Sequence, residues 1–197
     1  MKLICLGDSL TYGLGVRRDA VWTALLGRST GWHVVNRGVS GDTTGGMLVR
    51  LRPDVISELA TSPAGTQVLV MGGSNDIFAS GTDCCARGNL SAIIHQLFGI
   101  GVVPLVGIPL PVDPPVTPPA WRGAVDFRQA AETLEGYITW MHHYCQCFDV
   151  PVVDFGSQFR DESGAPRREW MLDGLHPNEL GHRQMAALLE ELLRRRI

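Results

Sequence analysis

The sequence predicts an α/β fold in which helices cover both faces of a central, mostly parallel, five-stranded sheet. Short apolar runs recur along the chain and alternate with segments of helical periodicity, as in buried parallel strands joined by helices. Most of these runs stop at glycine, proline or a polar residue, which is typical of a strand that has reached the rim of a sheet. We find no internal repeat and no linker, so we expect one domain over residues 1–197.

The apolar runs and the periodic segments place the individual elements in chain order. The predicted strands are residues 3–6, 34–35, 68–71, 102–108 and 152–153. The predicted helices are residues 20–26, 46–59, 90–98, 127–147 and 178–195. The proline-rich segment 109–121 can be neither a helix nor a central strand, so we expect a long, stiff surface loop after the fourth strand.

Composition narrows the classes of function and the compartment. The net charge of −3 argues against nucleic-acid binding, which usually requires a basic face. Five cysteines without the spacing of a disulfide framework favour a reducing compartment. No apolar run reaches the length of a membrane span, and residues 1–6 are too short for a secretory signal. We therefore expect a cytoplasmic protein with no membrane span; the oligomeric state stays open.

Polar residues and glycines collect where the predicted strands end. Ser9 stands in "GDSL" after the first strand, Gly41 in "SGDT" after the second, and Asn75 in "GGSND" after the third. Asp173 and His176 stand in "DGLHPN" just before the last helix. Each segment alone reads equally well as a turn or a helix cap. Because parallel strands end at one rim of a sheet, however, we expect these side chains to meet there.

These residue types are the ones that acyl transfer from an ester requires. Ser9 can attack as the nucleophile, His176 can take its proton, and Asp173 can hold the imidazole in the right tautomer. The backbone amides of Gly41 and Ser9 and the side-chain amide of Asn75 can form an oxyanion hole. This chemistry needs no metal and no organic cofactor.

The four blocks, in this order, resemble those of the SGNH or GDSL-type esterase and lipase superfamily, and the resemblance spans nearly the whole chain. It implies a three-layer α/β/α, flavodoxin-like SGNH hydrolase fold. It also implies that Ser9, Gly41, Asn75 and His176 are the residues after which the superfamily is named, with Asp173 as the third member of the triad.

Within the superfamily, the segments around Trp22 and Pro151 are most similar to the bacterial branch of arylesterases, thioesterase I and lysophospholipase. The resemblance implies a serine hydrolase that cleaves carboxylic esters and thioesters of short- to medium-chain acyl groups through an acyl-enzyme. In that branch the corresponding segments border the acyl pocket, which makes Ile77, Phe78 and Trp121 candidate substrate contacts.

Two other functions remain open at this point. Carbohydrate O-deacetylases share the same blocks, and the sequence does not fix the depth of a pocket. A non-catalytic, flavodoxin-like module could instead use the amides of "GDSLTYG" to bind a phosphate or a flavin. Such a module would give no reason for Asn75, Asp173 and His176.

Overall fold

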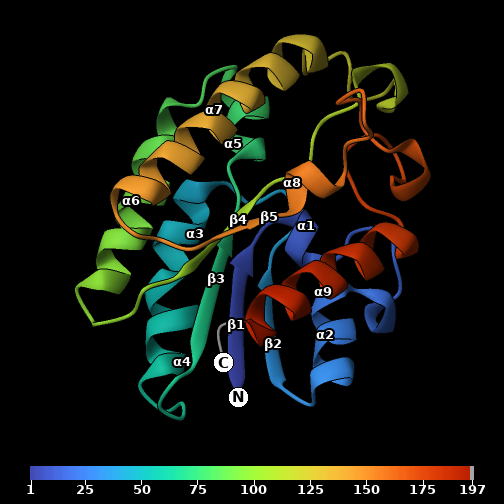
Figure 1. Cartoon of the computed structure of the whole chain (residues 1–197). Helices are drawn as coiled ribbons and strands as arrows, with labels where there is room; N and C mark the ends of the chain where they lie inside the picture. Colours follow the sequence, from blue (N-terminus) through green and yellow to red (C-terminus); the bar gives the residue numbers. More distant parts are fainter. Residues whose placement is uncertain (196–197) are drawn as a thin grey trace.

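The computed structural model describes residues 1–195, within which five parallel strands form one sheet (Figure 1). Their order, β2-β1-β3-β4-β5, is that of doubly wound, flavodoxin-like folds. The strands are β1 (Lys2–Gly7), β2 (His33–Gly38), β3 (Gln67–Met71), β4 (Leu105–Ile108) and β5 (Val152–Asp154). The predicted fold class is confirmed. That residues 1–197 form one domain stays a prediction, because Arg196 and Ile197 lie outside the described residues.

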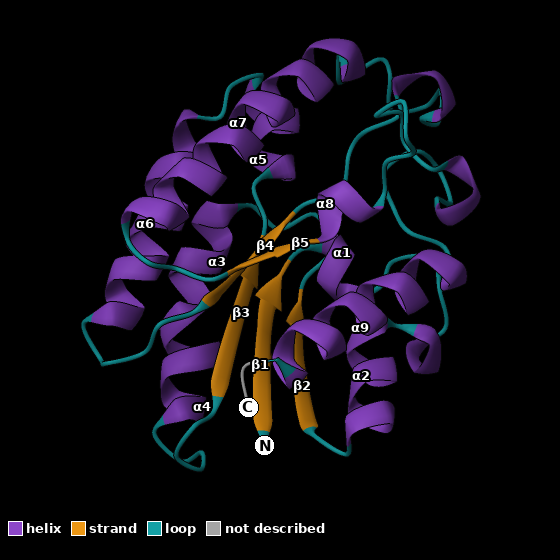
Figure 2. Ribbon diagram, viewed as in Figure 1, coloured by secondary structure: helices purple, strands orange, loops and turns teal. Residues whose placement is uncertain are grey.

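Helices lie on both faces of the sheet and complete a three-layer arrangement (Figure 2). One face is covered mainly by α3, α6 and α7, and the other by α2 and α9. The helices are α1 (Ser9–Tyr12), α2 (Trp22–Thr30), α3 (Thr44–Leu51), α4 (Ser57–Leu59), α5 (Ser74–Ser80), α6 (Cys84–Phe98), α7 (Phe127–Cys147), α8 (Phe155–Gln158) and α9 (Glu179–Arg194).

Strand β1 shows how one apolar run supplies two cores. Successive side chains of a strand point to opposite faces, so a strand that is buried on both faces must be apolar throughout. Leu3 and Cys5 lie in the core under α2 and α9, whereas Ile4 and Leu6 lie in the core under α3, α6 and α7. All four side chains are fully buried, which fixes β1 at the centre of the molecule.

Two of the differences from the expected element boundaries are explained by prolines. The predicted helix 46–59 begins at Thr44 and is interrupted by a π-helical turn, Arg52–Ile56, because Pro53 has no N–H to continue the α-helical pattern. The fourth strand, expected from residue 102, begins only at Leu105, because Pro104 cannot donate to a strand ladder.

Three short helices escaped prediction because they hold too few turns to show a periodicity. Helices α1 and α8 have four residues each, and α5 has seven. All three begin within three residues of the end of a strand, where the sequence suggested only turns.

The expectation of a surface loop at residues 109–121 is wrong for its first half. Leu110, Val112 and Asp113 are buried, and only from Pro114 onward does the chain reach the surface, in the 3₁₀ turn Pro114–Val116. Burial of the apolar side chains between the prolines favours this inward path of the chain. Proline also has no N–H that burial would leave unpaired.

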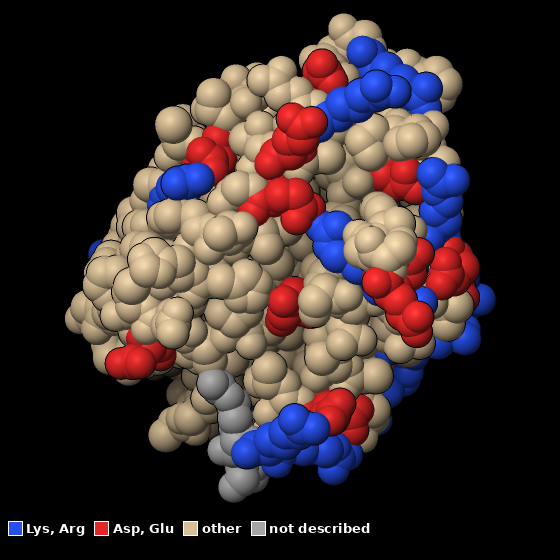
Figure 3. All heavy atoms as spheres, turned by 45° about the horizontal axis from the view of Figure 1, so that its top comes forward, with Lys and Arg blue, Asp and Glu red and all other residues tan. Residues whose placement is uncertain are grey.

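Charged side chains are spread over the surface. Figure 3, which brings the top of Figure 1 forward, shows Lys and Arg interspersed with Asp and Glu. Several form ion pairs, such as Arg17 with Asp19 and Arg160 with Glu135. Within residues 1–195, no helix combines the length and the apolar character needed to cross a bilayer.

Arg50 ties together the segments at the rim of the sheet. Its guanidinium donates to the carbonyl oxygens of Gly7 and Arg37, at the ends of β1 and β2, over 2.8 Å each. It also donates to the carboxylates of Asp42, over 2.7 Å, and Asp54, over 2.8 Å. The loop that follows β2 is thereby held against the ends of both strands.

We expect the substitution Arg50→Met to lower the free energy of unfolding by about 3 kcal/mol, because it leaves two carbonyls and a largely buried Asp42 carboxylate without their donor. Urea denaturation at pH 7 measures this loss. The exposed neighbour Arg52 provides the control, since Arg52→Met should change stability by less than about 0.5 kcal/mol. Equal losses in both variants would contradict the role given to Arg50.

Candidate active site

Ser9 lies at the point where β1 turns sharply into α1. Asp8 caps this helix, with its Oδ1 accepting the N–H of Leu10 over 2.9 Å. The turn is tight: a Cβ on Gly7 would lie 2.2 Å from Oγ1 of Thr11, so only glycine fits there. The short helix therefore presents Ser9, nearly buried, at the carboxyl end of the central strand.

His176 and Asp173 complete a hydrogen-bonded series with Ser9. Nε2 of His176 lies 3.0 Å from Oγ of Ser9, and its Nδ1 lies 2.8 Å from Oδ2 of Asp173. The other oxygen of Asp173 accepts the backbone N–H groups of Leu175, over 3.0 Å, and His176, over 2.8 Å. The turn between them needs Gly174, whose φ is +79°. Residues from opposite ends of the chain thus come within hydrogen-bond distance.

The charge of Asp173 determines how the imidazole is protonated. Burial raises the pKa of Asp173, but hydrogen bonds from the side chain and backbone of His176 outweigh it, so the pKa lies below its ordinary value. An ionised carboxylate can only accept, so Nδ1 of His176 must carry a hydrogen. In the neutral imidazole, the lone pair of Nε2 is then free to accept the hydroxyl hydrogen of Ser9.

Gly41 and Asn75 lie beside Ser9 and line the same cavity. Gly41 has a φ of +79° in the loop after β2, a backbone conformation that favours glycine. Nδ2 of Asn75 donates to the carbonyl of Asp42 over 2.9 Å, which fixes the orientation of the amide. The three predicted amide donors therefore border one space in front of Ser9.

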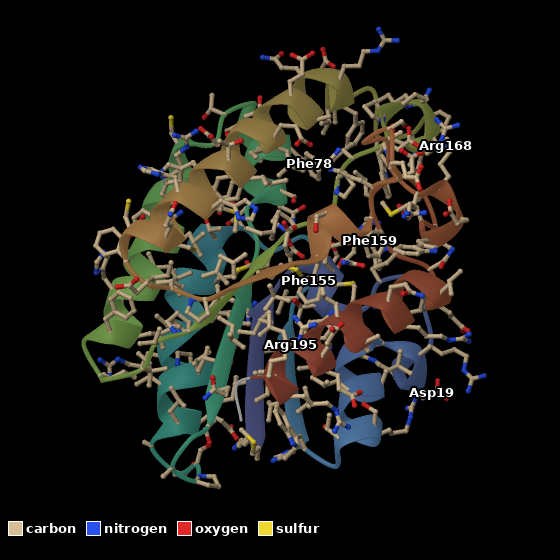
Figure 4. All side chains as sticks on the ribbon, in the orientation of Figure 1. Asp19, Phe78, Phe155, Phe159, Arg168 and Arg195 are labelled. Atoms are coloured by element: carbon tan, nitrogen blue, oxygen red, sulfur yellow. The ribbon has the colours of Figure 1, made fainter. Side chains whose placement is uncertain are left out.

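The cavity beside these groups has a volume of about 340 Å³ and is largely apolar. Phe78, from α5, forms part of its wall (Figure 4). Its ring meets that of Phe127 edge-on, with ring centroids 5.5 Å apart. Trp121 meets the imidazole of His176 edge-on at 6.1 Å between centroids. The other apolar lining residues are Leu10, Leu14, Leu110, Val112, Ala120, Ala124, Val125 and Leu175.

Of the three side chains predicted to contact substrate, Phe78 and Trp121 line this cavity and Ile77 does not. Ile77 is 1% exposed and packs in the core under α7. Ile77 and Phe78 differ in direction because consecutive residues of a helix point about 100° apart. Because the sequence predicted only a turn for this segment, it could not show that Ile77 and Phe78 point in different directions.

Three polar residues of the cavity were missed: Asp8, Ser40 and Ser74. Ser74 begins α5 and lines the cavity next to Asn75, and Asp8 lines it next to Ser9. Burial raises the pKa of Asp8 to about 6, with the Leu10 N–H and the imidazole of His176 acting in the opposite direction. The only signal in the sequence was the position of each beside a predicted site residue.

A family model and a curated relative match the sequence of this chain. The model of the GDSL-like lipase/acylhydrolase family matches residues 5–184, which confirms the resemblance in the sequence. Esterase TesA of Pseudomonas aeruginosa is 33% identical over 115 residues, a match that covers 55% of this chain and 55% of that esterase. The chain thus aligns with about half the length of this curated relative.

Solved structures with low sequence identity share the fold. The aryl esterase of M. smegmatis has a TM-score of 0.77 at 24% identity, covering 98% of each chain. Est24, a carbohydrate acetylesterase from Sinorhizobium meliloti, has a TM-score of 0.78 at 19% identity, covering 100% of this chain and 99% of that one.

Among residues 1–195 here, no group of three or more His, Cys, Asp or Glu side chains could hold a metal ion.

We expect Asp8→Asn to stabilise the protein at pH 8 by up to about 3 kcal/mol and to leave stability near pH 4 unchanged. The raised pKa means that between about pH 4 and 6 the folded protein binds a proton more strongly than the unfolded chain, so ionisation costs stability as the pH rises. Asparagine stays neutral and keeps the oxygen that caps α1. Urea denaturation of both proteins at pH 4, 6 and 8 measures the difference; a gap that does not grow with pH would contradict it.

Proposed function

The chain belongs to the GDSL-like lipase/acylhydrolase family of ester hydrolases, and from this premise we propose that it cleaves carboxylic esters and thioesters of short- to medium-chain acyl groups through an acyl-enzyme. The observation that carries the proposal is the series of hydrogen bonds from Ser9 through His176 to Asp173 beside an apolar cavity. Membership of the family supports ester hydrolysis. The acyl-enzyme intermediate and the preferred length of the acyl chain are proposed.

In the proposed reaction, Oγ of Ser9 attacks the acyl carbonyl while Nε2 of His176 takes the hydroxyl proton. The imidazolium then gives this proton to the leaving alcohol or thiol, which departs and leaves the acyl group on Ser9. A water molecule, deprotonated by the same nitrogen, attacks the acyl-enzyme, and the imidazolium returns that proton to Oγ of Ser9 as the acid is released. The ionised Asp173 stabilises the imidazolium in both halves of the reaction.

The proposed oxyanion hole consists of the backbone N–H groups of Ser9 and Gly41 and the side-chain amide of Asn75. Because one hydrogen of the Asn75 amide is engaged by the carbonyl of Asp42, the rotamer is fixed before substrate arrives. The second hydrogen remains for the developing negative charge. A donor held in place in this way contributes about 3–4 kcal/mol to transition-state stabilisation, because it need not reorganise during the reaction.

The lining of the cavity favours an acyl chain over a sugar. Leucine, valine and aromatic side chains surround the space beside Ser9. Burying the methylene groups of an acyl chain against such a surface makes the binding free energy more favourable. The carbohydrate acetylesterase with the same fold keeps sugar acetates as the second candidate substrate class. A non-catalytic phosphate-binding module is disfavoured, because phosphate binding gives no use for the contact between Ser9 and His176.

We expect the protein to release nitrophenol from p-nitrophenyl butyrate and Ser9→Ala to lower kcat by about 10³-fold or more. An organophosphate should add its mass to Ser9 alone, as determined by peptide mass spectrometry. The exposed Ser163 serves as control, and Ser163→Ala should retain full activity. Undiminished turnover by Ser9→Ala would exclude Ser9 as the nucleophile.

We expect Phe78→Ala to shift the preferred acyl chain of p-nitrophenyl esters to greater length, because the ring forms part of the cavity wall. The measurement is kcat/KM across a series from acetate to palmitate. Phe148→Ala, at a half-exposed aromatic residue after α7, should leave the series unchanged. Preference for acetate alone, with turnover of acetylated sugars, would favour the deacetylase over the proposed acyl esterase.

A further inference from the structure

A buried carboxylate outside the proposed triad lies close to the turn that carries His176. Asp113, after β4, is 4% exposed. Its carboxylate accepts two hydrogen bonds from the guanidinium of Arg168, with Nε at 2.5 Å from Oδ2 and Nη2 at 3.2 Å from Oδ1. Two-point contacts of this kind fix direction as well as distance.

Arg168 stands in the 3₁₀ turn Arg168–Trp170, shortly before Asp173 (Figure 4). At the other end of the same segment, the carbonyl of Gly174 accepts the backbone N–H of Asp113 over 2.8 Å. Asp113 therefore contacts the chain on both sides of Asp173, once through its side chain and once through its backbone.

The contact at Gly174 is also sterically close. A Cβ on this glycine would lie 2.8 Å from the carbonyl oxygen of Asp113 and 2.8 Å from Cγ2 of Val116. The turn thus rests directly on the segment after β4, and Trp121, farther along that segment, meets the imidazole edge-on. His176 itself stands in neither a helix nor a strand, so such contacts must hold its backbone.

Other nearby charged groups are engaged elsewhere. Arg122 donates to the carbonyls of Pro115, over 2.8 Å, and Thr117, over 2.6 and 3.0 Å. Arg167 donates to the carbonyl of Arg160 and lies over the ring of Trp170. Arg168 is the cation that the described residues present to Asp113.

We propose that Asp113, through its contacts with Arg168 and Gly174, is a positioning residue that keeps the Asp173–His176 turn in register with Ser9. The inference rests on the proposed function. Proton transfer requires Nε2 to stay within hydrogen-bond distance of Oγ, and a displacement of about 1 Å can cost up to a hundredfold in rate. Loss of the ion pair lets the turn move away from this geometry, while the cavity lining from other segments, such as Leu10, Leu14 and Phe78, stays in place.

The test uses Asp113→Asn, Arg168→Gln and the double variant with a p-nitrophenyl ester. We expect each single substitution to lower kcat about tenfold and to change KM less than twofold, since most of the cavity lining comes from segments outside the Asp173–His176 turn. The double variant should lose no more than either single one, because both remove the same contact. Organophosphate labelling of Ser9 should slow by the same factor, and Arg168→Lys should restore part of kcat.

Arg194→Gln is the matched control, because Arg194 is 67% exposed, Arg168 is 62% exposed, and each is paired with one carboxylate. This control should keep the full kcat. Unchanged kcat in Arg168→Gln, additive losses in the double variant, or losses equal to the unfolded fraction in urea titrations would each overturn the inference. Absence of ester turnover in the unmodified protein would instead overturn the proposed function.

Discussion

The parallel register of the central strands is the constraint on which the site depends. Gly7 of β1 lies level with Gly38 of β2 and with Met71 of β3, so the three strands end at one height. The segments that carry Ser9, Gly41 and Asn75 leave the sheet from that line. The two glycines allow a close approach, since a Cβ on Gly38 would lie 2.2 Å from the backbone nitrogen of Tyr12. Backbone pairing thus brings the segments of the nucleophile and of two predicted oxyanion donors to one edge, where Arg50 and the Asn75–Asp42 hydrogen bond hold them.

The acid–base half of the site is built differently. His176 and Asp173 stand in an irregular turn, and local hydrogen bonds determine its shape. Leu172 donates to the carbonyl of His176 over 2.7 Å, and the side chain of Asn178 both caps α9 and donates to the carbonyl of Glu169 over 2.8 Å. The strands fix one side of the site, whereas separate contacts hold the turn on the other, among them those of Asp113 with Arg168 and Gly174.

The sequence predicted what local patterns encode. Apolar runs predicted the strands, and the blocks at their ends predicted which residues would meet at the rim. What it missed depends on contacts that no local pattern carries. The direction of Ile77 follows from where α5 begins, and the burial of Leu110 and Val112 follows from what packs over them. The pairing of Asp113 with Arg168 joins residues 55 positions apart, across different segments.

Two carboxylates lie near the same imidazole and have opposite pKa shifts. Hydrogen bonds hold the pKa of Asp173 low, so its charge is available to orient and stabilise His176. Burial holds the pKa of Asp8 near 6, so at neutral pH its charge is a cost to the folded state. The same side chain caps α1 and so fixes Ser9, which an apolar residue could not do. The geometry of the nucleophile demands a hydrogen-bond acceptor in this buried place, and where that acceptor is a carboxylate, its ionisation lowers stability.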